Sequence, residues 1–326
     1  MSWSELSARV LTGSKLERHE AMQILQSPDD QVLSILDAAF CLRKHYFGLG
    51  VTLHVIRNAK SGACSEDCSY CSQSARSTAD ISRYTLQSVE TIVEGAREAA
   101  KLEAMRYCIV ISGRQPAETE LEIICEAARR IKREIPIQIC TSLGLLSDAQ
   151  AKRLKTAGVD RYNHNLETSS RHYQAICSTH TYEDRVATAK TVKETGLELC
   201  SGGLIGMGES LEDRVDLAFA LREVGADSIP LNFLDPRPGT AMEGRSRITA
   251  TEALRTLALF RFANPDREIR VAGGREVCLG ALQVLALYPA NSIFTTGYLT
   301  TGGQGHFADM AMIQSAGFHV AGITDA

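Results

Sequence analysis

The sequence lacks the apolar segments that membrane proteins and exported proteins carry. No apolar run approaches the roughly 18 residues that a bilayer-spanning helix requires. The first ten residues contain no apolar core of signal-peptide length, and Glu5, Glu17 and Glu20 argue against an acid-poor transit peptide. We therefore expect a cytoplasmic protein without a membrane span.

A large excess of charge of either sign is also missing. The 326 residues include 35 Lys and Arg against 39 Asp and Glu, which is a formal net charge of −4. A chain so nearly neutral is not expected to bind nucleic acid through a basic surface. Hydrophobic residues make up 44% of the chain, which suffices for a large core in one barrel-sized domain.

The chain is too long for a disulfide scaffold in spite of its cysteine content. Ten cysteines would suit a short secreted protein, whereas this chain has 326 residues and no expected export signal. We therefore expect free thiols in a reducing compartment, where they are available as metal ligands.

Short β-rich runs alternate with longer amphipathic stretches from about Thr52 onward. Eight strands are predicted, at Thr52–Ile56, Arg106–Ile111, Ile137–Thr141, Arg161–Asn165, Glu198–Gly203, Ser228–Asn232, Glu268–Ala272 and Ser292–Phe294. Helices are predicted near residues 88–101, 118–134, 147–157, 181–195, 210–224, 250–262 and 276–287, and Gly158, Gly196 and Gly225 follow three of them as caps. This alternation favours an α/β fold, a closed (β/α)8 barrel of TIM type, with an open doubly wound sheet as the alternative.

The chain is predicted to have three parts. Residues 1–46 carry helical spacing and are expected to form an N-terminal helical extension. Residues 47–301 make up the barrel. Residues 302–326 form a C-terminal tail that packs on or near the barrel, and Gly302, Gly303 and Gly305 make its course hard to predict.

Three cysteines lie within eight residues, directly after the first predicted strand. Cys64, Cys68 and Cys71 can bind three irons of a [4Fe–4S] cluster and leave the fourth iron open to a small molecule. A structural zinc site is the competing interpretation, but such sites normally close with a fourth ligand, and no second Cys-x-x-Cys pair follows. Loops that follow barrel strands form the active-site mouth, so chemistry is expected there.

Three further cysteines fall on predicted strands. Cys108, Cys140 and Cys200 lie on the second, third and fifth strands, and Arg270 lies on the seventh. Because side chains alternate along a strand, these four residues can meet inside the barrel as a second metal site. Considered alone, each cysteine is expected to be a small buried hydrophobic residue, and Arg270 is expected to pair with an interior acid. The remaining cysteines, Cys41, Cys125, Cys177 and Cys278, are expected to be structural.

These features resemble the radical S-adenosylmethionine enzymes, and within them the biotin synthase family. The resemblance rests on the cysteine loop, with Tyr70 before its last cysteine, and on the segments 58–74, 162–169, 200–209 and 270–276. It runs from the helical extension to the last strand. It implies a sulfurtransferase that makes biotin from dethiobiotin by radical chemistry.

The resemblance also implies two iron–sulfur clusters. By similarity, Cys64, Cys68 and Cys71 bind the [4Fe–4S] cluster that chelates S-adenosylmethionine, whose cleavage yields a 5′-deoxyadenosyl radical. By similarity, Cys108, Cys140, Cys200 and Arg270 hold a [2Fe–2S] cluster that donates the inserted sulfur. No catalytic residue beyond these ligands is implied. A flavodoxin or ferredoxin is implied as electron donor, and a homodimer as the assembly.

Cofactor and substrate contacts follow from the same resemblance. Asn165 and Glu167 are expected near the ribose, Arg185 at the methionine carboxylate, and Tyr70, Gly202, Gly203 and Glu209 elsewhere around S-adenosylmethionine. Family members commonly carry Asp where this chain has Glu167. For dethiobiotin the expected contacts are Asn165, Asn232 at the cyclic urea, and Thr300 and Thr301 at the carboxylate, although a simple Thr-Gly turn also explains the two threonines. His164 is expected to be a hydrogen-bonded structural residue that points away from the lumen.

Two other functions stay open. A radical enzyme resembling the hydrogenase maturases would use the cysteine loop and leave Cys108, Cys140 and Cys200 as core. An iron–sulfur scaffold without radical turnover would keep cysteine ligands but would not need a glycine-rich strand end or a ribose contact at Asn165. The presence of both features favours the enzyme.

Overall fold

A parallel sheet closes on itself in the computed structural model, which describes residues 2–322. The strands are β1 (Gly50–Lys60), β2 (Arg106–Ile111), β3 (Gln138–Ser142), β4 (Arg161–Asn163), β5 (Glu198–Cys200), β6 (Gly203–Ile205), β7 (Ser228–Phe233), β8 (Glu268–Val271) and β9 (Ser292–Phe294). They pair in the order β1, β2, β3, β4, β5, β7, β8 and β9, and β9 pairs back with β1. The predicted TIM-type barrel is therefore confirmed, and each predicted strand overlaps an observed one.

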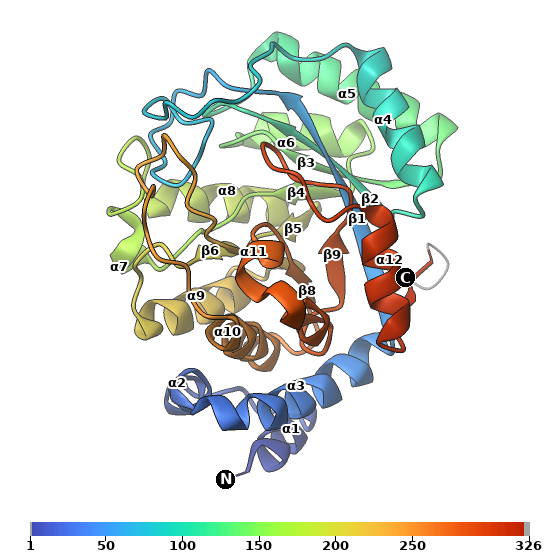
Figure 1. Cartoon of the computed structure of the whole chain (residues 1–326). Helices are drawn as coiled ribbons and strands as arrows, with labels where there is room; N and C mark the ends of the chain where they lie inside the picture. Colours follow the sequence, from blue (N-terminus) through green and yellow to red (C-terminus); the bar gives the residue numbers. More distant parts are fainter. Residues whose placement is uncertain (1, 323–326) are drawn as a thin grey trace.

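Helices cover the outside of the barrel (Figure 1). They are α4 (Val89–Lys101), α5 (Glu118–Glu134), α6 (Asp148–Thr156), α7 (Ser170–Tyr173), α8 (Tyr182–Glu194), α9 (Leu211–Glu223), α10 (Ala250–Ala263), α11 (Arg275–Leu279) and α12 (His306–Ser315). Ser147, Thr181 and Ser210 cap three of these helices by accepting a hydrogen bond from a backbone N–H in the first turn. Gly158 and Gly196 follow α6 and α8 with φ of +95° and +74°, as a helix-ending glycine does.

The predicted helix at 276–287 is only partly correct. α11 ends after five residues, and a 3-10 helix, η2 (Gly280–Leu287), follows it. Gly280 has a φ of +52°, a backbone conformation that stops an α-helix and that glycine adopts readily. The segment is therefore helical throughout but changes type at this glycine.

The fifth predicted strand is interrupted near its end. β5 and β6 both pair with β7, with Cys200 opposite Ser228 and Gly203 opposite Leu231. Gly202 lies between them, and a Cβ atom there would meet the Pro230 carbonyl oxygen at 1.9 Å. The close approach of the two backbones therefore requires glycine at this position.

The N-terminal segment is helical, as predicted. It comprises α1 (Trp3–Leu11), α2 (Arg18–Gln26), a 3-10 turn, η1 (Asp29–Gln31), and α3 (Val32–Phe47). These helices pack together outside the barrel, against α9 and α10 (Figure 1). Buried Ile24, Ile35 and Leu42 join the same apolar core as the barrel. The extension therefore supports the barrel wall away from the cysteines.

The chain after Thr301 leads away from the cysteine loop. It forms α12 and then β10 (His319–Val320), which pairs with Gly50 and Val51 at the start of β1. Since the cysteine loop follows the end of β1, β10 lies at the opposite end of the barrel. Within residues 2–322, no helix is both long and apolar enough to cross a membrane.

Candidate active site

Side chains alternate along the barrel strands, and the alternation separates an apolar outside from a polar inside. Ile109, Ile139 and Leu199 face outward and are fully buried in the core. Their neighbours face the lumen and line a cavity of about 310 Å³, among them Ile56, Cys108, Val110, Cys140, Asn163, Cys200, Asn232, Arg270 and Phe294. The period of two along each strand therefore brings distant residues into one chamber.

The three strand cysteines meet in this chamber. Cys108 on β2 lies beside Cys140 on β3 in the strand register. The Cys140 thiol donates a hydrogen bond that lowers the pKa of Cys108, and Cys200 hydrogen-bonds to Cys140 in turn. Arg270 on β8 points its Nη1 at the Cys200 Sγ, 3.7 Å away. The structure thus brings together the four residues predicted as the second metal site.

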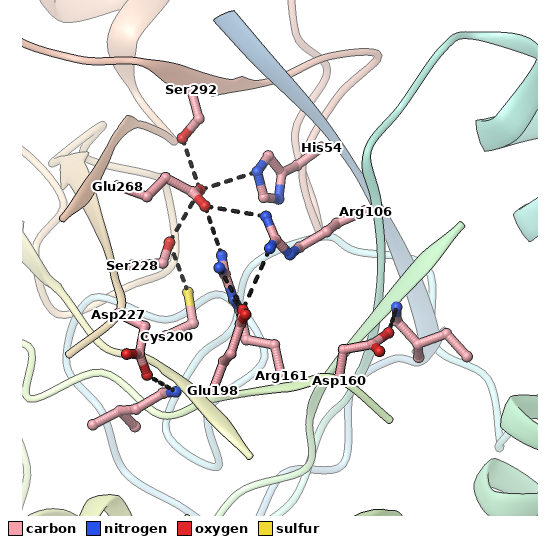
Figure 2. Close-up of polar contacts among 12 residues, drawn as sticks. His54, Arg106, Asp160, Arg161, Glu198, Cys200, Asp227, Ser228, Glu268 and Ser292 are labelled. Carbon is pink, nitrogen blue, oxygen red and sulfur yellow. Dashed lines mark hydrogen bonds and ion pairs between the residues drawn. The ribbon is translucent and has the colours of Figure 1, made fainter. Parts of the chain in front are cut away.

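A network of charged side chains forms the floor beneath these thiols, with Glu268 at its centre (Figure 2). One Glu268 oxygen accepts hydrogen bonds from Arg106 at 3.1 Å and Arg161 at 2.8 Å. The other oxygen is bonded by Arg270, by the Ser228 and Ser292 hydroxyls and by His54, whose Nε2 lies 3.0 Å away. Arg270 is therefore paired with an interior acid while its guanidinium also reaches the cysteines.

The pKa values on this floor follow from burial and from neighbouring charges. Burial alone would raise the pKa of Glu268, but Arg161 and Arg270 hold it well below its usual range. Burial and the charge of Arg270 lower the pKa of His54 to about 3, so this histidine is neutral. Three guanidinium groups therefore face one buried carboxylate and the partly exposed Glu198. Hydrogen bonds among the thiols and burial raise the pKa of Cys140 and of Cys200, and the nearby positive charge of Arg161 opposes both shifts.

The cysteine loop lies at the mouth of the barrel. Gly62 and Ala63, with φ of +75° and +49°, turn the chain out of β1 immediately before Cys64. Cys64, Cys68 and Cys71 line a second cavity of about 180 Å³, and Cys71 also lines the lumen cavity. Cys71 therefore lies on both cavities, between the two predicted metal sites.

Arg185 on α8 is held at the edge of the mouth cavity by several contacts. Its Nη1 donates to the Asn165 carbonyl oxygen at 2.7 Å and lies 3.8 Å from Glu167 Oε1. Its Nε donates to the Tyr173 hydroxyl, which in turn bonds His180 Nε2 at 2.8 Å. This chain of contacts fixes the guanidinium beside the cysteine loop.

Asn165 and Glu167 line both cavities, as expected for residues between two sites. The Asn165 side-chain oxygen accepts a hydrogen bond from the Gly202 N–H at 3.1 Å. Glu167 adopts a φ of +69°, which is rare for a residue with a side chain and marks a constrained position. Burial raises the pKa of Glu167, and Tyr70 hydrogen-bonds to it. Tyr70 also lines the lumen cavity.

Three predicted cofactor contacts have another role in the structure. Gly202 and Gly203 are not among the residues that line either cavity, and their missing side chains let neighbouring backbone approach: a Cβ on Gly203 would meet the Glu167 carbonyl oxygen at 2.5 Å. The Glu209 carboxylate accepts hydrogen bonds from the Gly206 and Met207 N–H groups and from Arg214. Glu209 therefore stabilises the loop after β6, and a direct contact of these three residues with S-adenosylmethionine stays a prediction.

The predicted dethiobiotin contacts lie together on the lumen cavity. Asn232, Thr300 and Thr301 all line it. The Asn232 amide is held from both sides, because it donates to the Gly203 carbonyl at 3.3 Å and accepts from the Gly273 N–H at 3.0 Å. Because a carboxamide has two N–H donors and an oxygen with two lone pairs, Asn232 is fixed in orientation and keeps hydrogen-bonding capacity for a ligand.

Two residues have surroundings that the sequence did not indicate. His164 was expected to point away from the lumen with its polar atoms satisfied, but it lines the mouth cavity, and its Nε2 is buried without a partner among the described residues. Cys177 was expected to be structural, but its Sγ lies 3.9 Å from the Cys68 Sγ. Cys177 is 109 residues from Cys68 along the chain, so no local pattern in the sequence signals the contact.

The donor sets suit the clusters that the resemblance implies. All ten cysteines, which lie within the described residues, are free thiols. In the lumen, Arg270 Nε is buried without a hydrogen-bond partner in residues 2–322, beside three thiols that can all act as thiolate ligands. At the mouth, three thiols face a cavity that also contains Asn165 and Arg185, the kind of groups that bind a small zwitterion.

Known proteins match the chain over nearly its whole length. Residues 59–221 match the radical SAM superfamily, and residues 230–319 match the biotin and thiamin synthesis associated domain. The biotin synthase of Salinibacter ruber is 50% identical over 99% of this chain and 90% of its own length. The biotin synthase of Bacillus subtilis strain 168 is 49% identical over 99% of this chain and 96% of its own length.

Solved structures show the same fold at lower identity. Methylornithine synthase superposes with a TM-score of 0.86 at 20% identity, covering 98% of both chains. The FeFe-hydrogenase maturase HydG from Carboxydothermus hydrogenoformans superposes with a TM-score of 0.81 at 18% identity, covering 97% of this chain and 78% of that one. At these identities the likeness concerns the fold alone. The identity of about 50% to two biotin synthases, over nearly the full length, shows that this chain is a radical SAM enzyme that belongs to the biotin synthase family.

Proposed function

We propose that this chain inserts sulfur into dethiobiotin to form biotin, by a radical reaction that begins with cleavage of S-adenosylmethionine. The observation that carries the proposal is the lumen cavity, whose lining includes both Cys71 of the mouth loop and the three strand cysteines. A sulfur-inserting enzyme needs the radical source and the sulfur source to reach the same substrate carbon. One cavity of about 310 Å³ bounded by both cysteine sets meets that need.

The residues that would hold the cofactors divide between the two ends of the cavity. Cys64, Cys68 and Cys71 would hold a [4Fe–4S] cluster, with Arg185, Asn165, Glu167 and Tyr70 around S-adenosylmethionine. Cys108, Cys140, Cys200 and Arg270 would hold a [2Fe–2S] cluster. When bound, these groups supply a carbon-centred radical able to remove hydrogen from unactivated carbon, and the sulfur that replaces it.

The protein side chains position the substrate and keep water away. Ile56, Val110, Phe233 and Phe294 give the cavity an apolar wall suited to an alkyl chain. Asn232 supplies an amide face, and Thr300 and Thr301 supply hydroxyl groups for a carboxylate at the mouth. Exclusion of water by a bound substrate would also protect a radical from side reactions with solvent.

A hydrogenase-maturase-like activity is the second candidate. Its support is the fold alone, because HydG shares 18% identity with this chain. In such an enzyme the lumen cysteines would be ordinary core residues. Burying charged groups without a function would destabilise the fold, because they lose their hydration. The charged floor beneath these cysteines, made of Arg106, Arg161, Glu268 and Arg270, therefore favours the sulfur-inserting activity.

The deciding experiment is anaerobic turnover. Protein reconstituted with iron and sulfide is mixed with dethiobiotin, S-adenosylmethionine and a low-potential one-electron reductant, and biotin and 5′-deoxyadenosine are measured by mass spectrometry. We expect both products, and two clusters that Mössbauer spectra distinguish. Formation of 5′-deoxyadenosine without biotin, with a single cluster type throughout, would reject sulfur insertion.

The remaining parts of the proposal concern the cellular setting and the domain division. A flavodoxin or ferredoxin is proposed as electron donor, a homodimer as the assembly, and the cytoplasm as the compartment, for which ten free thiols give support. Residues 1–46, 47–301 and 302–326 are proposed as extension, barrel and tail. Size-exclusion chromatography with light scattering tests the dimer.

A further inference from the structure

A third group of metal-binding side chains adjoins the cysteine loop and contains none of the predicted cluster ligands. It consists of Glu66, Cys177 and His180, whose donor atoms all lie within 4.8 Å of one another. Each side chain is buried. Glu66 belongs to the cysteine loop, whereas Cys177 and His180 lie in the turn between α7 and α8.

We propose that Glu66, Cys177 and His180 bind a single divalent transition-metal ion of the Zn²⁺ or Fe²⁺ type. A thiolate, an imidazole and a carboxylate are the three ligand types that these borderline ions take together, whereas Mg²⁺ and Ca²⁺ prefer oxygen alone. Three protein ligands also leave the fourth tetrahedral position open. The inferred ion is distinct from either iron–sulfur cluster and goes beyond the proposed sulfur insertion.

The spacing of the sulfur and nitrogen donors fits such an ion, and Glu66 Oε2 would move away from Nδ1 when an ion replaces their shared proton. Cys177 Sγ lies 3.4 Å from His180 Nδ1. Around a tetrahedral zinc, bonds of about 2.3 Å to sulfur and about 2.0 Å to nitrogen put these two atoms about 3.5 Å apart. His180 Nδ1 and Glu66 Oε2 share a hydrogen bond, and an ion would replace the shared proton, as it would the Cys177 thiol proton.

Neighbouring residues hold the proposed ligands in place by hydrogen bonds, as the residues around a metal site do in metalloproteins. The Tyr173 hydroxyl bonds His180 Nε2 at 2.8 Å, which fixes the ring and leaves Nδ1 for an ion. The Thr179 hydroxyl donates to Glu66 Oε2 at 2.6 Å. Asp67 accepts from the Ser178 N–H at 2.9 Å and from the Thr179 N–H at 3.2 Å, so the turn that carries Cys177 is tied to the cysteine loop.

An ion has a route to this group. Glu66 and His180 line the mouth cavity together with Cys64 and Cys68. The cavity is open enough to admit S-adenosylmethionine in the proposed function, so it also admits a hydrated ion. The Cys177 Sγ lies 3.9 Å from the Cys68 Sγ, which places the inferred ion directly beside a cluster ligand.

The experiment uses the full chain with its clusters loaded anaerobically and Co²⁺ as a spectroscopic stand-in for Zn²⁺. Stoichiometric additions of Co²⁺ are followed by visible difference spectra and by metal analysis after gel filtration. We expect one equivalent bound, with tetrahedral d–d bands and a thiolate-to-cobalt charge-transfer band. Zn²⁺ should displace the Co²⁺ and remove these bands.

Variants then assign the site. Cys177→Ser and His180→Gln should each lose the bound equivalent and the charge-transfer band. Cys278→Ser, which removes another buried free thiol, should keep both. The iron content and the [4Fe–4S] Mössbauer signal should be the same in all of these proteins, because the proposed ligands do not belong to the cluster.

Three results would overturn the inference. They are no Co²⁺ bound by the parent chain, an unchanged Co²⁺ spectrum in Cys177→Ser and His180→Gln, or loss of the [4Fe–4S] signal in Cys177→Ser, which would make Cys177 a cluster or folding residue. Thermal melting of the two variants, compared with the parent, checks that they are folded. Biotin formation is measured separately, so the failure of this inference is distinguishable from failure of the proposed function.

Discussion

The two cysteine sets of this barrel are built in opposite ways. The mouth set comes from one loop of eight residues, Cys64 to Cys71, and its thiols are half-buried beside an open cavity. The lumen set comes from three strands, and its thiols are fully enclosed. A site made by one loop can open to a small cofactor, whereas a site made by separate strands is as rigid as the barrel itself.

The electrostatic surroundings of the two sets differ as well. Beneath the lumen thiols, Arg106, Arg161 and Arg270 converge on Glu268 and leave surplus positive charge. At the mouth, Arg185 lies beside Glu167, so the local charges balance. The lumen is thus arranged to retain an anionic group, and the mouth to exchange a zwitterionic one. Four substitutions test this division.

The largest effect is expected at the mouth, from Cys68→Ala. Removing one of three thiolates should prevent binding of the [4Fe–4S] cluster, so both 5′-deoxyadenosine and biotin should fall to background. The lumen cluster should persist in the Mössbauer spectrum. Cys41→Ala, which removes an exposed thiol on α3, serves as the control and should leave both products unchanged. Substantial 5′-deoxyadenosine from Cys68→Ala would contradict the assignment.

The next effect separates the two sites. Cys140→Ala should remove the lumen cluster and abolish biotin formation, while cleavage of S-adenosylmethionine continues because the mouth is intact. Mass spectrometry of both products measures the split. Cys125→Ala on α5 removes a buried thiol outside the lumen and should keep both products. If Cys140→Ala still formed biotin, the lumen thiols would be ordinary core residues and not cluster ligands.

The third substitution concerns the charged floor. Glu268→Gln removes the carboxylate that Arg106, Arg161 and Arg270 share, and it should lower the free energy of unfolding by about 3–5 kcal/mol, because buried charges lose their partner. Urea denaturation of the cluster-free chain measures the loss.

Glu198→Gln is the matched control for the floor. The Glu198 side chain is 47% exposed, and the same change there should cost less than about 1 kcal/mol, because solvent screens its ion pairs. Equal losses from the two variants would show that Glu268 is not the centre of the network.

The smallest effect is expected at Tyr173, which links His180 to Arg185. Tyr173→Phe removes one hydroxyl and should weaken S-adenosylmethionine binding about fivefold, or about 1 kcal/mol, by loosening Arg185. Equilibrium dialysis of the reconstituted protein measures the affinity. Tyr182→Phe changes the ring that packs against Tyr173 at 5.9 Å and should have no comparable effect. Similar losses in both would indicate general loosening of the turn.

Much of the barrel could be predicted, because its signals are local. Strands with capped helices between them follow from patterns within about ten residues of each position. The cysteine loop is equally local. The lumen set was predictable only through the fold: once the strands are counted, their alternating residues must share an interior.

Gly202, Gly203 and Glu209 have structural contacts that the sequence alone did not reveal. Gly202 and Gly203 look like a ligand-binding glycine run, yet Pro230 and Glu167 occupy the space beside them. Glu209 looks like a ligand contact, yet the backbone of its own loop uses its carboxylate. In each case the atoms that contact the residue are known only from the folded structure.

The sequence by itself determined the barrel, the cysteine loop and the membership of the strand cysteines in one interior, because periodicity and connectivity dictate these directly. Only the tertiary structure decided that Glu268 joins three arginines under the lumen thiols, and that Cys177 and His180 reach Glu66 of the mouth loop. Apart from the pair of Glu268 and Arg270, these contacts join residues more than a hundred positions apart. They depend on how helices and loops pack, which no local spacing encodes.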